Sequence, residues 1–285
     1  MPVIVASRID RFPKGREETD VNDYALNPQL SRDETTEVIE GLVTGWSIPE
    51  EIPQGINTIV VPDSECPNGA RFGARALHTL VLRSRPRTLV VISSGPVEKP
   101  VMQSMGQVET ALGSCSIDER LSARLANRME SDLDIVSEMD ISGSSLQRLT
   151  PLLCQVLAPG CRFVPWILPE KIDEPQSLID LGTQLGKALT EEQGACVVAG
   201  LSLPQRHASA PETEVTADAT ILRHILDPDP HLFFESSLQG KLRDMAPMLV
   251  ALGQARERHG LKGHLLEHGE VESAGTHWGA ASLAI

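Results

Sequence analysis

Asp63, Glu65 and Cys66, three side chains that can bind a metal ion or transfer a proton, stand close together in one short segment. The segment follows an apolar run at 59–61 and leads into a helical pattern that begins at Arg71. In an open α/β sheet, ligands and catalytic groups collect in the loops at the carboxyl ends of the strands. We therefore expect a functional site at this strand end.

Two more polar side chains are expected at the same edge of the sheet. Ser94 follows the β-branched run 88–92, and His207 comes shortly after the apolar run 197–201. Because the carboxyl ends of neighbouring parallel strands meet at one edge, both should lie near Asp63. One interpretation of the set is metal-free ligand binding or acid–base chemistry in a cleft, with the polar groups Asp63, Glu65, Arg71 and His207.

A metal centre is the other interpretation of these residues. A redox-active iron or copper site needs about three His, carboxylate or Cys ligands in one cavity. Asp63 and His207 would be its ligands, with Glu65 and Cys66 nearby. No spacing brings three ligands together, and an aspartate beside a proline at a strand end is more often a turn residue. The sequence therefore favours a site without metal.

Other catalytic signals are weak. His264 and His268 are four residues apart, and in the strand expected there they face one side about 13 Å apart, too far for one ion. Serines stand at expected strand ends, but none lies in a Gly-x-Ser-x-Gly elbow; they are Ser64, Ser93, Ser94 and Ser202. A P-loop lysine and a dinucleotide-binding motif are absent as well. The sequence thus identifies neither a serine nucleophile nor a phosphate-binding loop.

The elements that would position these residues alternate between strands and helices. Apolar runs predict strands at 59–62, 88–92, 162–168 and 196–201, with a short strand at 135–136 and a terminal pair at 264–268 and 278–285. Helical spacing predicts helices at 32–45, 71–85, 144–157 and 178–189, and within 214–226 and 240–258. Ser116 and Glu119 form a capping box that opens one more helix. For 97–113 the sequence indicates only a hairpin or loop.

This alternation predicts an α/β protein: a three-layer αβα sandwich around a mostly parallel sheet. The 285 residues show no repeat of fixed period and no low-complexity linker. We therefore expect a single domain over 1–285, with an N-terminal extension and first helix at 1–55 and the core at 56–285.

Composition narrows the class of partner and the compartment. A formal net charge of −14 argues against nucleic acid and anionic membranes as partners. No apolar run is long enough to span a bilayer, and no signal-peptide core is visible. The five cysteines are scattered without a C-x-x-C pair, so we expect no disulfide framework and read Cys154 and Cys196 as buried free thiols. These features favour a reduced, cytoplasmic protein.

Several strings within about 56–285 resemble the Memo family, protein B of the bacterial AmmeMemoRadiSam system, which is related in fold to the class III extradiol dioxygenases. Pro62 with Asp63 is similar to the start of a Pro-His-Ala-Gly-Tyr loop, with Asp63 in the histidine's place. The run 90–96 is similar to the strand before Gly-Pro-Ser/Asn-His, and 142–149 to a Glu-His-Ser segment, but both lack the histidine. The ending 267–284 is the most similar part.

The resemblance implies a Memo-like fold whose metal centre uses two histidines and a cysteine. None of these ligands has a counterpart here, and the helix after Arg243 lacks the Cys-Gly pair that precedes it in the family. The resemblance thus implies a pseudoenzyme without a cofactor, acting as a binding or structural subunit with a protein partner, or as a homo- or hetero-oligomer, and able to hold a small molecule. The alternative is a non-heme iron or copper oxidoreductase of the dioxygenase type with the rewritten ligands Asp63 and His207. The cleft candidates are Asp63, Glu65, Cys66, Arg71, Ser94, His207 and Arg243.

Overall fold

The computed structural model describes residues 32–62, 69–110, 113–129, 132–141, 144, 146–156, 160–203, 205–207, 212–240, 242–258, 262–273 and 276–285, with the backbone alone at some of these positions. Three expected site residues, Asp63, Glu65 and Cys66, lie outside these residues, as does most of the expected N-terminal extension. For His207 the backbone is described.

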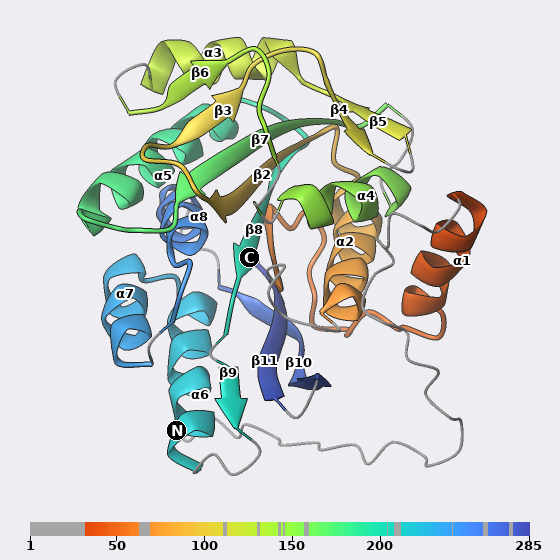
Figure 1. Ribbon diagram of the computed structural model, residues 1–285, viewed down its shortest axis with the longest axis vertical. Coiled ribbons are helices and arrows are strands. Elements are labelled where there is room, and N and C mark those ends of the chain that lie inside the picture. The colour runs from red at the N-terminus through yellow and green to blue at the C-terminus, as the bar shows by residue number, and fades with distance from the viewer. Residues whose placement is uncertain are drawn as a thin grey trace.

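The described strands build one nine-stranded mixed sheet (Figure 1). Eight strands follow the order β10-β11-β1-β8-β2-β7-β3-β6, and β9 pairs with β11. The central four run parallel to one another: β1 (Thr58–Pro62), β8 (Ala195–Leu201), β2 (Thr88–Gly95) and β7 (Arg162–Pro169). Around them lie β3 (Val101–Gln103), β6 (Asp134–Val136), β9 (Gln205–His207), β10 (His264–Ser273) and β11 (Thr276–Ala284). A separate hairpin is formed by β4 (Gln107–Thr110) and β5 (Gly113–Ser116).

Every residue of β1, β2 and β8 is buried, because helices cover the sheet on both faces. One apolar cluster joins Val60, Val90 and Val197 to α3 (Glu119–Met129), α5 (Pro175–Thr190), α6 (Glu212–Leu226), α7 (Pro230–Gln239) and α8 (Ala246–Glu257). The other joins Ile59, Leu89 and Val198 to α1 (Arg32–Val43), α2 (Ala70–Ser84) and α4 (Leu146–Val156). In Figure 1 the second group lies to the right of the central strands and α5 to α8 lie to the left. The predicted α/β fold with a helix-flanked, centrally parallel sheet is confirmed.

Helix α8 is buried almost all round, since ten of its residues, from Ala246 to Ala255, are inaccessible. On one side Gln254 donates a hydrogen bond of 2.6 Å to the Thr58 hydroxyl of β1. On the other side α8 packs closely on α5, where a Cβ at Gly186 would lie 2.8 Å from the Gln254 carbonyl oxygen. A Cβ at Gly253 would lie 2.6 Å from the Ile179 carbonyl oxygen. Glycine is thus required for this close approach of two helix backbones.

Three local expectations need correction. Helix α3 is capped by Asp118, whose carboxylate accepts from the Leu121 amide at 3.0 Å, because Ser116 belongs to β5. Asp229 caps a helix, α7, that the sequence had not indicated, and its carboxylate accepts from the amides of His231 and Leu232 at 3.0 Å each. The short strand β9 was also missed.

His264 and His268 do not face one side of their strand. The terminal pair β10–β11 forms as expected, but its register shifts between Leu265 and Glu267. His264 therefore pairs with Ala284 and His268 with Ala281, two positions that belong to the apolar clusters on opposite faces of the sheet. The bulge adds one residue and so reverses the direction of every later side chain.

Cys115 and Cys154 form a disulfide that the cysteine spacing did not indicate. The bond joins β5 to the last turn of α4 across a sequence separation of 39, with the two Cα atoms 6.2 Å apart. Cys154 is therefore not a free thiol, whereas Cys196 is free and buried as expected. Disulfides are more frequent in oxidising compartments, so this bond weighs against the expectation of a cytoplasmic protein, which stays a prediction.

No helix in the part of the chain that the structure describes is long and apolar enough to cross a membrane. The division of the chain into one domain also stays a prediction.

We predict that Gly186→Ala destabilises the protein by about 1–3 kcal/mol, because the added methyl meets the backbone of α8. The matched control is Gly41→Ala in α1, where an added Cβ would have nothing within 4 Å. That change should stabilise the protein by about 0.5–1 kcal/mol through helix propensity. Urea unfolding of both variants measures the difference, and equal midpoints would contradict the close α5–α8 contact.

Candidate functional site

The register of the parallel strands brings their carboxyl ends to one edge. Pro62 of β1 pairs with Leu201 of β8. Ile92 of β2 pairs with Ala199, so Ser94, two residues on, is level with Leu201. The predicted meeting of the strand ends near Ser94 is therefore present. We call this the carboxyl edge.

Two hydroxyl groups at the carboxyl edge are buried without a hydrogen-bond partner. Ser94 and Ser202 are only 5% and 6% exposed, and the Oγ atom of each has no partner. By contrast, the neighbouring Ser93 hydroxyl donates to the Trp166 carbonyl at 3.4 Å. A buried hydroxyl without a protein partner costs about 1–3 kcal/mol unless water or a ligand bonds to it. Ser122, Ser237 and Ser282 have such hydroxyls as well, so it is the place of Ser94 and Ser202 at the strand ends that makes them candidates for ligand binding.

The two hydroxyls belong to opposite faces of the sheet. Ser94 continues the alternation of Val90 and Ile92, which lie in the apolar cluster with α8. Ser202 continues the alternation of Cys196 and Val198, which lie in the cluster with α2 and α4. The carboxyl edge therefore offers polar groups on both sides of the strand ends.

The segment before α4 closes one side of this edge. A Cβ at Gly95 would lie 2.7 Å from the Ile167 side chain and 3.1 Å from the Ser144 Cβ. Ser144 is held in place by its hydroxyl, which donates to the Ile141 carbonyl at 2.7 Å. Helix α4 is thus positioned directly against the end of β2.

Arg71 is engaged in an ion pair. Its guanidinium lies 3.4 Å from Glu267 of β10, and Arg75, one turn later in α2, donates to the same oxygen at 2.7 Å. Arg75 also donates to the Leu42 carbonyl and lies over the Trp46 ring, 4.9 Å from its centroid. The two arginines therefore fasten α2 to β10 and α1.

The remaining described candidates are more scattered. Arg243 lies three residues before α8 with an exposed side chain. The backbone of His207 pairs with Thr276, whereas the register of β1 brings Pro62 level with Ala281. Five residues of β11 thus separate Pro62 from His207, about 17 Å along the strand. Strand β9 therefore pairs with the first residues of β11, and β1 pairs with its last residues.

No group of three His, Cys, Asp or Glu side chains that could hold a metal ion is found among the described residues. Asp63, Glu65, Cys66 and the side chain of His207 lie outside that search.

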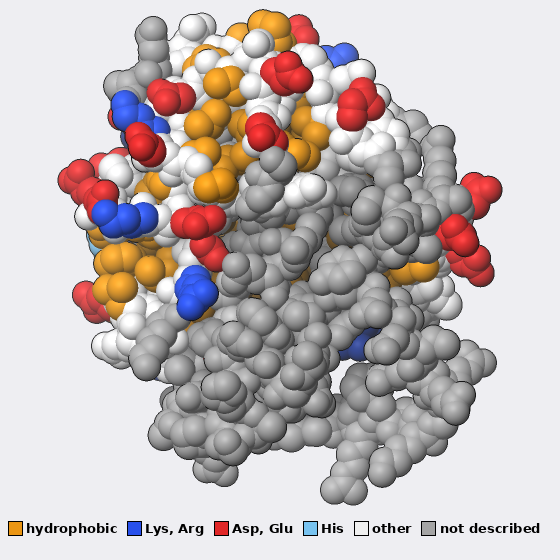
Figure 2. Space-filling view, viewed as in Figure 1, with side chains coloured by type: hydrophobic (Ala, Val, Ile, Leu, Met, Phe, Trp, Pro, Cys, Tyr) orange, Lys and Arg blue, Asp and Glu red, His pale blue; other side chains and the backbone are white. Residues whose placement is uncertain are grey.

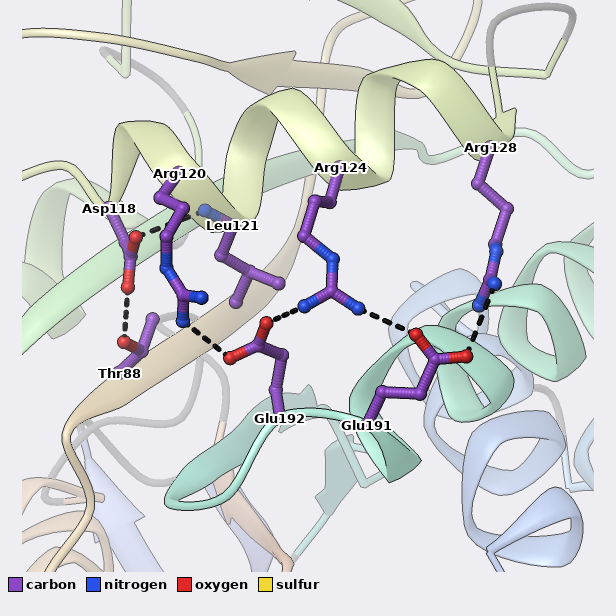
Figure 3. A network of polar contacts seen from close by, with 8 residues as sticks. All are labelled: Thr88, Asp118, Arg120, Leu121, Arg124, Arg128, Glu191 and Glu192. Carbon is purple, nitrogen blue, oxygen red and sulfur yellow. Dashed lines mark hydrogen bonds and ion pairs between the residues drawn. The ribbon is translucent and has the colours of Figure 1, made fainter.

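A charge network that the sequence reasoning missed lies at the opposite, amino edge (Figure 3). Arg120, Arg124 and Arg128 extend from one side of α3 toward Glu191 and Glu192, which follow α5. Next to it the Thr88 hydroxyl at the start of β2 donates to the cap residue Asp118. Arginines four residues apart and two adjacent glutamates were the available signal. Because each of these arginines has an acidic partner, the network serves to fasten α3 to the sheet.

No protein-family model and no curated protein matches this sequence. Among solved structures, the chain is similar to the uncharacterized protein JW3007 from Escherichia coli K12, with a TM-score of 0.58 and 12% sequence identity. The similarity covers 81% of this chain and 99% of that one. At this identity the likeness supports the fold and no particular activity.

We predict that Ser94→Ala leaves the melting temperature unchanged or slightly raises it, because the hydroxyl it removes has no protein partner. Thr88→Val is the matched comparison, since it removes a buried hydroxyl that bonds to Asp118. The free energy of unfolding of that variant should fall by about 1–3 kcal/mol. Thermal unfolding of both variants measures the difference. A large fall in the melting temperature of Ser94→Ala would show that the hydroxyl has a structural role.

Proposed function

We propose that this chain is a Memo-like protein with a degenerate metal site, which binds a small polar ligand at the carboxyl edge and works with a protein partner. The observation that carries the proposal is the pair of buried, unpartnered hydroxyls of Ser94 and Ser202 at the ends of adjacent strands. Strand ends in open α/β sheets are the usual place for a ligand. The fold similarity to JW3007 is compatible with a Memo-like scaffold but does not select it.

The chemistry of this edge favours a neutral, hydrogen-bonding ligand. A serine hydroxyl both donates and accepts, so it can bind an amide, a hydroxyl or a carbonyl group. The described arginine nearest in sequence to the segment after β1, Arg71, already contacts Glu267. We infer that the described serine side chains at this edge bind a ligand through hydrogen bonds.

A non-heme iron or copper enzyme is the second candidate function. It would use Asp63 and His207, but about 17 Å of strand separates the backbone of Pro62, next to Asp63, from that of His207. The binding function is preferred because the family's own metal ligands have no counterpart in this sequence.

Elemental analysis of the purified protein tests both functions. We expect substoichiometric iron, copper and zinc, and an unchanged metal content in the double variant Asp63→Ala/His207→Ala. Stoichiometric metal that disappears in that variant would replace the binding proposal with the enzyme. Ser94→Ala serves as the control, since a serine hydroxyl is a poor ligand for these metals.

An exposed apolar area supports the proposal of a protein partner. Figure 2 shows hydrophobic side chains gathered on the upper part of the face in view, with acidic side chains around them. Among the described residues, Met105 before β4 is 50% exposed and Ile135 of β6 is 38% exposed. Contiguous apolar surface of this kind marks interaction sites more often than isolated side chains do.

If this area binds a second copy of the chain, Ile135→Lys should lower the molar mass measured by light scattering. Leu238→Lys, a change at a 55% exposed leucine of α7, is the control. A wild-type chain that is monomeric at all concentrations would exclude self-association and leave only a different protein as partner.

A further inference from the structure

The Cys115–Cys154 disulfide is a candidate for reversible chemistry, because both cysteines are partly exposed. Thiol–disulfide exchange requires that an attacking thiolate reach one of the two sulfur atoms. Fully buried disulfides are protected from this attack, and this one is not.

The bond fastens a hairpin that has little other support. Strands β4 and β5 form their own two-stranded sheet, separate from the nine-stranded one. An isolated two-stranded hairpin is at best marginally stable in water. Val108, 6% exposed, belongs to the apolar cluster under α4, and Cys115 packs against it. A single bridge between Ile117, which follows β5, and Phe163 of β7 connects this part of the chain to the main sheet. The disulfide adds a covalent link from β5 to α4.

The same bond fixes α4, which reaches from the amino half of the molecule to the carboxyl edge. Cys154 stands in the last turn of α4, and Ser144, just before its first turn, touches Gly95 at the end of β2. Between them, Leu152 packs against Gly73 of α2, where an added Cβ would lie 3.3 Å from its side chain. Helix α4 thus lies between the disulfide and the end of β2.

The other described cysteines do not compete for the bond. Burial raises the pKa of Cys161 to about 12 and that of Cys196 to about 11. The thiolate is the nucleophile, so both thiols are almost entirely protonated and unreactive at neutral pH. Oxidation and reduction are therefore confined, among the described cysteines, to Cys115 and Cys154.

We propose that Cys115 and Cys154 form a redox-controlled clamp that couples the β4–β5 hairpin and α4 to the state of small cellular thiols. A small thiolate attacks one sulfur atom, forms a mixed disulfide and releases the other protein sulfur as a thiolate, which takes up a proton. A second small thiol then displaces the first protein sulfur. Two small thiols are oxidised to one small disulfide, and the protein disulfide is reduced to two thiols. The proposal is independent of the proposed function.

The test uses the full-length protein equilibrated with mixtures of reduced and oxidised glutathione, without denaturant. Alkylation followed by mass spectrometry should show two additional thiols in the reduced form, on Cys115 and Cys154. Reduction should lower the melting temperature by about 5–15 °C, since it opens a loop of about 40 residues. Hydrogen exchange should become faster in β4, β5 and α4, and at 93–97 where Ser144 contacts β2.

Matched variants separate the clamp from a general effect of thiols. Cys161→Ser keeps the bond and should respond to glutathione as the wild type does. Cys115→Ser/Cys154→Ser should show the reduced exchange pattern in every mixture. If that double variant does not fold, the wild-type titration alone decides. The proposal fails if both cysteines are thiols in the air-oxidised protein, if reduction requires denaturant, or if reduction leaves hydrogen exchange in α4 unchanged.

Discussion

Burial of the four central strands on both faces is the constraint on which the rest of this structure depends. The backbone N–H and C=O groups of a central parallel strand form hydrogen bonds to the strands on either side. Its side chains point alternately to the two faces of the sheet, and both faces must be covered. All residues of β1, β2 and β8 are buried, so each face needs its own layer of helices. Helix α8 is the most deeply buried helix in this layer, since it packs on the strands with one side and on α5 with the other. The glycines of α5 and α8 follow from that double contact.

The same constraint decides where polar groups collect. Backbone groups inside the sheet are paired through its ladders, whereas side chains at the strand ends depend on the neighbouring loops for their hydrogen bonds. Near the carboxyl edge, β1 pairs with one part of β11 and β9 with another. Ser94 and Ser202 lie at the strand ends and retain hydroxyls without partners. These two hydroxyls are the groups on which the proposed binding role depends.

The two edges of the sheet differ in their polar interactions. At the amino edge, charges are matched: the arginines of α3 contact Glu191 and Glu192, and Thr88 contacts Asp118. In the other helix layer a covalent bond connects the hairpin to α4. The carboxyl edge has no comparable fastening among its described hydroxyls, and α4 is the element that links the disulfide to it. Helix α4 thus lies between the disulfide and the proposed binding edge.

The apolar runs predicted the four central strands and the helical repeats predicted most of the helices, because packing did not override these local patterns. The sequence also placed Ser94 at the end of β2. Helix α7 and strand β9 were missed, since Asp229-Pro230 looks like a turn and a three-residue strand has no period of its own. Of the expected site, Arg71 proved to be held by Glu267, a residue 196 positions away in the chain.

Only the tertiary structure decided which distant residues meet. The bulge in β10 turned His264 and His268 to opposite faces, because one extra residue in a strand cannot be seen in its composition. Cys115 and Cys154 came together because the packing of α4 on the hairpin, and no local spacing, brings their Cα atoms to 6.2 Å. The unpartnered state of the two serine hydroxyls likewise depends on which neighbours the fold supplies. A sequence pattern predicts which residues of one helix or strand are buried. A functional site or a disulfide depends on how residues far apart in the sequence are brought together.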